Sequence, residues 1–194
     1  MAAPPSAWVL AVNGISPRIA PDVFLAPGAV IVGDVEIGPG SSVWFNAVIR
    51  GDVAPVRIGA RTNIQDGAVI HLDPDAPCTI GDDVTVGHRA VVHGTTVGNG
   101  VIIGMGSVVL SRSRVGNGVI IAAGAVVPEG MDIPDGALVA GVPATIKRML
   151  DDERQHALIR SATGYVTNAA RFRATLDDRT SEWLREAEGV VGGS

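Results

Sequence analysis

Residues 97–127 read VGNGVIIGMGSVVLSRSRVGNGVIIAAGAVV and place an aliphatic side chain at every sixth position. An α-helix does not repeat every six residues, and a single amphipathic strand repeats every two. A six-residue unit instead predicts one short strand followed by one sharp turn, with Gly, Asn or Asp in the turn. The same spacing extends along most of the chain, with breaks, through Leu25, Ile31, Ile37, Val43, Ile49, Ile58, Ile64, Ile70, Ile80, Val86, Val92, Val97, Ile103, Val109, Val115, Ile121, Val127, Ile133 and Val139.

Three such units close one triangular coil of about 18 residues whose aliphatic side chains point inward. Stacked coils hydrogen-bond at a spacing of about 4.8 Å and bury a continuous column of valine and isoleucine. The composition agrees, because glycine is abundant and aromatic residues make up only 4% of the chain. We therefore predict an all-β solenoid, a parallel β-helix of hexapeptide repeats with about six coils.

The breaks in this spacing are also informative. Three extra residues fall between Ile49 and Ile58, around Val53–Val56, and four fall between Ile70 and Ile80, in the stretch LDPDAP. We expect both insertions to be loops that leave the solenoid on one side, where such loops often border a functional site.

After residue 140 the six-residue spacing ends and apolar residues recur at helical spacing. We predict one long helix from about 150 to 174 that packs along the β-helix, then a second short helical stretch around Trp183 and Leu184 and a frayed tail, VVGGS. The chain then divides into a β-helix domain, 1–144, and a C-terminal helical segment, 145–190.

Charge and composition exclude several classes of partner. A net charge of −5 leaves no basic stripe to replace phosphate counterions, so nucleic acid is not expected as a partner. No run of about 18 apolar residues is present to cross a membrane, and the first residues do not resemble a signal peptide. Cys78 is the only cysteine, which excludes an intrachain disulfide and fits a reducing compartment. We expect a soluble cytoplasmic protein.

Three of the four histidines lie within 23 residues, and counting coils predicts where they meet. His71 and His93 each follow an inward residue, and these two residues are one full coil apart once the loop is excluded. Their Cα atoms should be about 5 Å apart, close enough for both rings to bind one cation. His88 should lie near another edge of the triangle, so a three-fold axis is needed to bring it to a neighbour's His71 and His93.

The same count predicts two columns of polar residues. Arg50 lies one coil before His71, and Asp66 lies one coil before His88. If the two histidine columns meet between subunits, Arg50 should meet Asp66 there, either as a structural bridge or as a catalytic element. Gln65 lies beside Asp66 and could orient a water on the metal.

Taken in order, these motifs resemble those of the gamma-class carbonic anhydrases over residues 10–170. The segments that carry the resemblance are WFNAVIRGD (44–52), TNIQDG (62–67), His71, GH (87–88), VHG (92–94), IGMGS (103–107) and AGVPA (140–144). The resemblance implies a left-handed β-helix, a homotrimer, and reversible hydration of carbon dioxide to bicarbonate. It also implies Zn²⁺, with Fe²⁺ or Co²⁺ as alternatives, held by His71 and His93 of one subunit and His88 of the next.

The resemblance further implies roles for residues around the metal. Gln65 would contact the hydroxide or bicarbonate, whereas Arg50, Asp52 and Asp66 would form a supporting network at the interface. Asn63 belongs to the same site, and Tyr165 corresponds to a tyrosine that the C-terminal helix places near the metal.

The chain departs from the best-characterised branch in the residues that move protons. Val53 stands where that branch has a glutamate, and the loop after His71 lacks the acidic insertion with a proton-shuttling glutamate. Asp73 and Asp75 are candidate substitutes, although carboxyl groups with pKa values near 4 relay protons poorly at neutral pH. Two alternatives to hydration remain open: an acyl-CoA thioesterase or acyltransferase on the same trimer, and a metal-stabilised structural subunit without catalysis.

Overall fold

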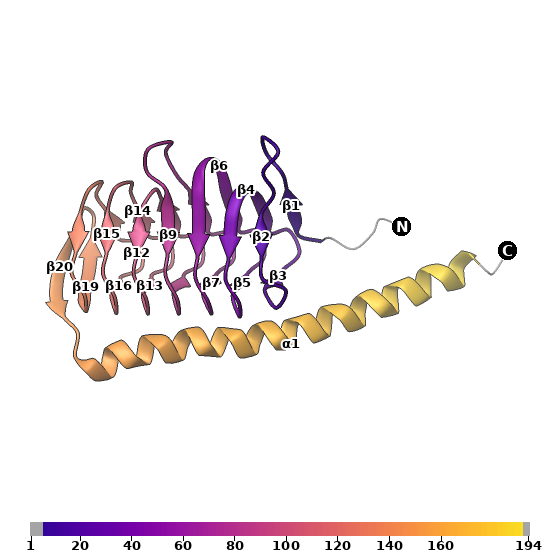
Figure 1. Cartoon of the computed structure of the whole chain (residues 1–194). Coiled ribbons are helices and arrows are strands. Elements are labelled where there is room, and N and C mark those ends of the chain that lie inside the picture. Colours follow the sequence, from indigo (N-terminus) through magenta and orange to yellow (C-terminus); the bar gives the residue numbers. More distant parts are fainter. Residues whose placement is uncertain (1–5, 192–194) are drawn as a thin grey trace.

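The computed structural model describes residues 6–191 of the chain, and side chains within residues 6–176. It is a left-handed parallel β-helix of about seven coils followed by a C-terminal helix (Figure 1). Each coil contributes one strand to each of three faces, which we number in the order that the chain visits them.

The strands of each face pair in parallel with the coils before and after. The first face contains the first halves of β4 (Val30–Ile37) and β6 (Val48–Ile58), together with β1 (Trp8–Leu10), β8 (Val69–His71), β11 (Val91–His93), β14 (Val108–Val109) and β17 (Val126–Val127). The second face contains the second halves of β4 and β6, together with β2 (Arg18–Ile19), β9 (Cys78–Ile80), β12 (Thr96–Val97), β15 (Arg114–Val115) and β18 (Asp132–Ile133). The third face contains β3 (Phe24–Leu25), β5 (Ser42–Val43), β7 (Asn63–Ile64), β10 (Thr85–Val86), β13 (Ile102–Ile103), β16 (Ile120–Ile121) and β19 (Ala137–Gly141), closed by the antiparallel β20 (Ala144–Met149).

The core is the aliphatic column that the six-residue spacing predicts. Of the predicted inward side chains, Leu25 is partly buried and all the others are buried. A glycine often follows the inward residue of the second face, because stacked backbones there leave no space for a side chain. A Cβ added to Gly81, for example, would lie 2.7 Å from the carbonyl oxygen of Gly98 in the next coil.

The structure corrects the predicted number of coils from about six to about seven. The extra coil is the first, where β1 pairs with β4 through Trp8 and Val30, and β2 pairs with β4 through Arg18 and Glu36. This coil lacks the aliphatic six-residue spacing because the turn between Val12 and Ile15 interrupts it.

The first predicted loop is also corrected, because residues 53–56 form part of the continuous strand β6 and shift its register against β4. The second insertion is a loop, Leu72–Pro77, and a backbone bridge between Asp73 and Ala76 closes it.

The C-terminal helix α1 (Asp152–Val191) is continuous, so the prediction of a separate short helix around Trp183 and Leu184 is wrong. Residues 175–183 contain neither glycine nor proline, and nothing in them ends the helix that begins at Asp152. The predicted frayed tail falls partly outside the described residues: Val190 and Val191 are helical, and 192–194 are not described. The predicted division at 144/145 falls at the start of β20.

α1 runs back alongside the whole stack of coils (Figure 1). Near its start Gln155 lies against Gly118 and Gly136, at the edge between the second and third faces. Further on, Ala169 and Phe172 pack against Phe24 and Trp44, with Trp44 at the edge between the third and first faces. The helix therefore crosses the third face diagonally. Among the described residues, no helix combines the length and the apolar character that crossing a membrane requires.

Candidate metal centre

His71 and His93 end the strands β8 and β11 and are paired residue to residue in adjacent coils, as the coil count predicts. Their ring centroids are 5.1 Å apart, and the ring planes are inclined by 63°. Nδ1 of His71 lies 3.1 Å from Nε2 of His93. Two nitrogens that each lie about 2.0–2.1 Å from a tetrahedral zinc ion are about 3.3 Å apart, so this pair has the spacing of two zinc ligands.

The outer nitrogen of the His71 ring faces Asp52, at 3.1 Å from Oδ1, and Arg50 pairs with the other oxygen of the same carboxylate. Burial alone would raise the pKa of Asp52, but hydrogen bonds from His71, from its own backbone N–H and from Arg50 outweigh burial and hold the pKa below its ordinary value. An ionised carboxylate only accepts hydrogen bonds, so Nε2 of His71 carries its proton and Nδ1 keeps a lone pair for a metal.

The outer nitrogen of the His93 ring faces a hydroxyl group. Nδ1 of His93 lies 2.8 Å from Oγ of Ser111, and Ser111 donates to Oδ2 of Asp73 at 2.6 Å. Asp73 belongs to the loop that follows His71, so this loop begins beside one histidine of the pair and contacts the hydrogen-bond partner of the other.

A second cluster lies at the opposite edge of the first face. Nδ1 of His88 contacts Oδ2 of Asp66 at 2.8 Å, which leaves Nε2 of this half-exposed ring directed elsewhere. Gln65 is buried: its amide nitrogen donates to Asn63 at 3.1 Å, and its oxygen accepts the backbone N–H of His88 at 3.2 Å. Asn63 in turn donates to Thr85 in the next coil, at 2.9 Å.

Tyr165 of α1 joins this second cluster. Its ring packs edge-on against Trp44 with centroids 5.7 Å apart, and its hydroxyl lies near the side chain of Gln65. Burial, and then the charge of Asp66, raise the pKa of Tyr165, and the neighbouring side chain of Gln65 opposes them. The diagonal path of the helix thus places this hydroxyl beside Gln65.

One protomer does not bring the two clusters together. Within the described part of the chain, no three His, Cys, Asp or Glu side chains are placed to hold one ion. Within the chain Arg50 pairs with Asp52, and Asp66 pairs with His88. The contact between Arg50 of one subunit and Asp66 of another stays a prediction.

Sequence reasoning missed Ser111. The pairing of β11 with β14 places Leu110, not Ser111, over His93, because the coil between Val92 and Val109 is one residue shorter than the standard 18. The turn after β14 then brings Ser111 to the ring. Residue counting that allowed the register of this short coil to shift by one position would identify Ser111.

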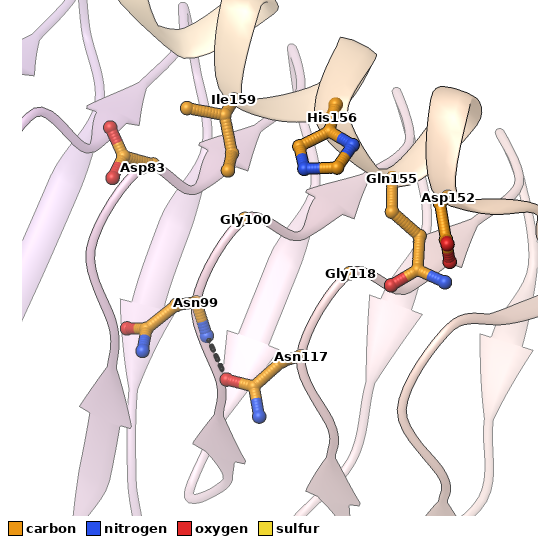
Figure 2. Close-up of a pocket in the computed structure, with 9 residues that line it drawn as sticks. All are labelled: Asp83, Asn99, Gly100, Asn117, Gly118, Asp152, Gln155, His156 and Ile159. Carbon is orange, nitrogen blue, oxygen red and sulfur yellow. Dashed lines mark hydrogen bonds between the residues drawn. The ribbon is translucent and has the colours of Figure 1, made fainter.

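A separate cavity of about 350 Å³ lies between the start of α1 and the edge between the second and third faces (Figure 2). His156 lies here, away from the other histidines, with Asn99 and Asn117 below it. The backbone N–H of Asn99 donates to the side chain of Asn117 at 2.9 Å, one of several such bonds that join successive coils. These asparagines have a structural role.

Known proteins match this chain over most of its length. Models of hexapeptide repeats match twice: the bacterial transferase hexapeptide at residues 16–51, and the hexapeptide repeat of succinyl-transferase at 77–111. A carbonic anhydrase of Geobacillus kaustophilus is 47% identical over 87% of this chain and 93% of its own length. Mitochondrial gamma carbonic anhydrase 2 of Arabidopsis thaliana is 40% identical over 87% of this chain, which spans 63% of that protein.

Among solved structures, a Bacillus cereus protein provisionally described as an acetyltransferase superimposes with a TM-score of 0.85. It is 39% identical, and the match covers 88% of this chain and 99% of that protein. The match to the Geobacillus protein spans 169 of the 194 residues and therefore includes residues 50–93, which carry the histidines of both clusters. The chain belongs to the gamma-class carbonic anhydrase family of hexapeptide-repeat, left-handed β-helix proteins.

Proposed function

We propose that this protein is a zinc-dependent carbonic anhydrase that hydrates carbon dioxide reversibly to bicarbonate, with Fe²⁺ or Co²⁺ as alternative metals. The observation that carries the proposal is the pair of imidazole nitrogens, on His71 and His93, at the spacing of two zinc ligands. A structural zinc site is usually closed by four protein ligands, whereas three histidines leave a position open for water.

The active form in this proposal is a homotrimer in which His88 of one protomer completes the site of the next. The first face supports this assembly, because the outward side chains that directly precede its inward residues are apolar: Trp8, Val30, Val48, Val69, Val91, Val108 and Val126. The corresponding outward positions of the second face are polar: Arg18, Glu36, Arg57, Thr79, Thr96, Arg114 and Asp132. The third face carries α1.

The apolar first face thus has one of the two clusters along each of its edges, and in this proposal each cluster is a half-site. Leu110, at one edge, and Met105, at the other, are large apolar residues that are 38% and 58% exposed in the isolated protomer. Contact between the first faces of neighbouring protomers would cover both residues and bring unlike half-sites together about a three-fold axis.

When bound at such a site, zinc lowers the pKa of a coordinated water to near neutrality and so supplies a hydroxide nucleophile. The residues of the chain position the reactants. Asp52 and Asp66 orient the rings of His71 and His88, and the buried amide of Gln65 is fixed by Asn63 and by the backbone of His88. We expect the remaining N–H of Gln65 to hydrogen-bond to a substrate oxygen, with Tyr165 as its neighbour.

The proton that hydration releases must reach solvent. Asp75 is a poor carrier, because hydrogen bonds from Arg112 and its own backbone hold its pKa below the ordinary value. It therefore stays ionised at neutral pH. Exchange of protons with a dissolved buffer is the route that we expect, and turnover should rise with buffer concentration.

The test is metal analysis of anaerobically purified protein combined with stopped-flow carbon dioxide hydration. We expect one metal per protomer and measurable hydration, with both lost in a His88→Ala variant that remains trimeric. A metal-replete wild-type protein without hydration at any pH would contradict the catalytic role.

A second candidate function is acyl transfer from, or hydrolysis of, an acyl-CoA thioester. The observation that favours it is the close structural match to the Bacillus cereus protein described provisionally as an acetyltransferase. Release of free thiol from acetyl-CoA, without any carbon dioxide hydration, would support this function over the first. The buried thiol of the single cysteine, Cys78, is compatible with a reducing compartment, and we place the protein in the cytoplasm.

A further inference from the structure

We propose that Ser111, backed by Asp73, is a positioning residue that fixes His93 in the tautomer with a free lone pair on Nε2. The inference rests on the proposed metal site and deepens it, because it assigns a role to two residues and to the loop Leu72–Pro77.

The first step is the direction of the hydrogen bonds. Ser111 has one hydroxyl proton, and its oxygen lies 2.6 Å from Asp73 and 2.8 Å from Nδ1 of His93. The geometry directs the hydroxyl proton to Oδ2 of Asp73, with Ser111 as the donor. The hydroxyl oxygen can then only accept from the imidazole, and Nδ1 of His93 therefore carries a proton.

The second step is the consequence for the other ring nitrogen. A neutral imidazole that is protonated at Nδ1 has its lone pair on Nε2, and this atom is the one that faces His71 at 3.1 Å. Asp52 imposes the matching condition on His71. The chain therefore presents two lone pairs to one point, and a cation there removes their mutual repulsion.

The third step concerns the loop. Asp73 is 38 residues before Ser111, and only a loop that leaves the solenoid can carry its carboxylate across the intervening coil. Two contacts hold this loop in place: the backbone bridge between Asp73 and Ala76, and a bidentate pair between Arg112 and Asp75 at 2.8 and 2.9 Å. The loop inserted after His71 thus supplies the carboxylate that accepts the hydroxyl proton of Ser111, the hydrogen-bond partner of His93.

A purely structural role predicts different behaviour. Ser111 is 7% exposed and could simply pack against the loop. In that case any small side chain would serve, and loosening the loop would be as harmful as removing the hydroxyl. Asp75→Ala provides the matched control, because it breaks a contact of the same loop and leaves the hydrogen bonds of His93 in place.

The experiment measures Zn²⁺ affinity by competition with a chromophoric chelator in the full-length wild-type protein and in four variants. Loss of an outer hydrogen bond to a metal-binding histidine typically lowers affinity about 10–100-fold, and we expect a loss of this size for Ser111→Ala. Ser111→Thr, which retains a hydroxyl, should recover most of the affinity, and Asp75→Ala should bind as the wild type does.

The double variant Ser111→Ala/Asp73→Ala excludes rescue by a direct contact, because Asp73 is 3.8 Å from His93 and could move closer. We expect it to bind zinc at least as weakly as Ser111→Ala. Wild-type affinity in the double variant, or an equal loss in Asp75→Ala, would overturn the proposal.

A second measurement separates this inference from the catalytic proposal. Long-range ¹H–¹⁵N spectra of the metal-free protein, with labelled histidine and at a pH where the rings are neutral, report which nitrogen of His93 is protonated. We expect Nδ1–H in the wild type and a mixture in Ser111→Ala. A wild-type ring protonated at Nε2 would overturn the inference, whereas zinc binding without hydration would contradict only the catalytic function.

Discussion

Two defective variants should restore each other if the metal site is shared between protomers. His93→Ala removes one ligand of the stacked pair, and His88→Ala removes the ligand that the neighbour contributes. Each variant alone leaves every site of a homotrimer incomplete, so each should lose bound zinc and hydration. A mixed trimer differs, because one of its interfaces joins the intact pair of a His88→Ala protomer to the intact His88 of a His93→Ala protomer.

The size of the recovery follows from the symmetry. Any trimer that contains both variants has three interfaces: one is complete, one lacks two ligands, and one joins identical variants and lacks a single ligand. A preparation of mixed trimers alone should therefore hold about one third of the wild-type zinc and activity per protomer.

The assay is co-expression of the two variants with different affinity tags, tandem purification of the mixed trimers, and measurement of zinc content and hydration rate. If all three histidines belonged to one protomer, every protomer in the mixture would lack a ligand. Mixed trimers with no zinc would then refute a site shared between subunits, and so would wild-type protein that is monomeric yet binds zinc with full affinity.

Three further outcomes are expected. Gly104→Ala should lower the free energy of unfolding, measured in urea, by about 2–4 kcal/mol, because its Cβ would lie 2.6 Å from backbone atoms of Ile121 and Ala122. Gly124→Ala has no atom within 4 Å of its Cβ but a φ of 68°, and should lower it by about 1 kcal/mol. Equal losses in the two variants would contradict this account. Because the raised pKa of Tyr165 means that the unfolded chain releases its phenol proton first, wild-type stability should fall as the pH rises above the ordinary value of 10.0, and a Tyr165→Phe variant measured in parallel should show a smaller decline. Asp52→Asn should weaken zinc binding about 10–100-fold in chelator competition. Because the pKa of Asp52 is below its ordinary value of 3.8, the carboxylate is ionised at neutral pH, and its contribution should disappear only in strong acid. Unchanged affinity at pH 7 would count against a role in orienting His71.

The sequence predicts the fold well because its dominant signal is local and repeated. Each inward residue, such as Ile103 or Ile121, identifies one strand, and the register between coils follows from simple counting. The same counting places His71 over His93. It fails in the first coil, where Val9 and Ile19 are separated by a turn and no repeat is visible.

The surroundings of the proposed metal site are harder to predict, because they depend on turns and not on strands. Strand register specifies which residues are paired, but the conformation of a turn determines where its side chains point. Ser111 and Asp73 both lie in turns or loops, and their contact joins positions that no period relates. The way in which α1 packs on the coils is likewise not predicted by the six-residue spacing, so the expectation that Tyr165 lies near the site came from the family resemblance alone.

The path of α1 has a consequence for how the molecule unfolds. Solenoids usually behave as one-dimensional arrays whose terminal repeats open independently. Here the helix leaves the last coil through β20 and packs Ala169 and Phe172 onto Phe24 and Trp44 of the earliest coils. Its 40 residues extend for about 60 Å, more than the roughly 34 Å that seven coils occupy. Opening either end must therefore disturb a structure shared with the other, which should make unfolding more cooperative than in a solenoid without such a helix.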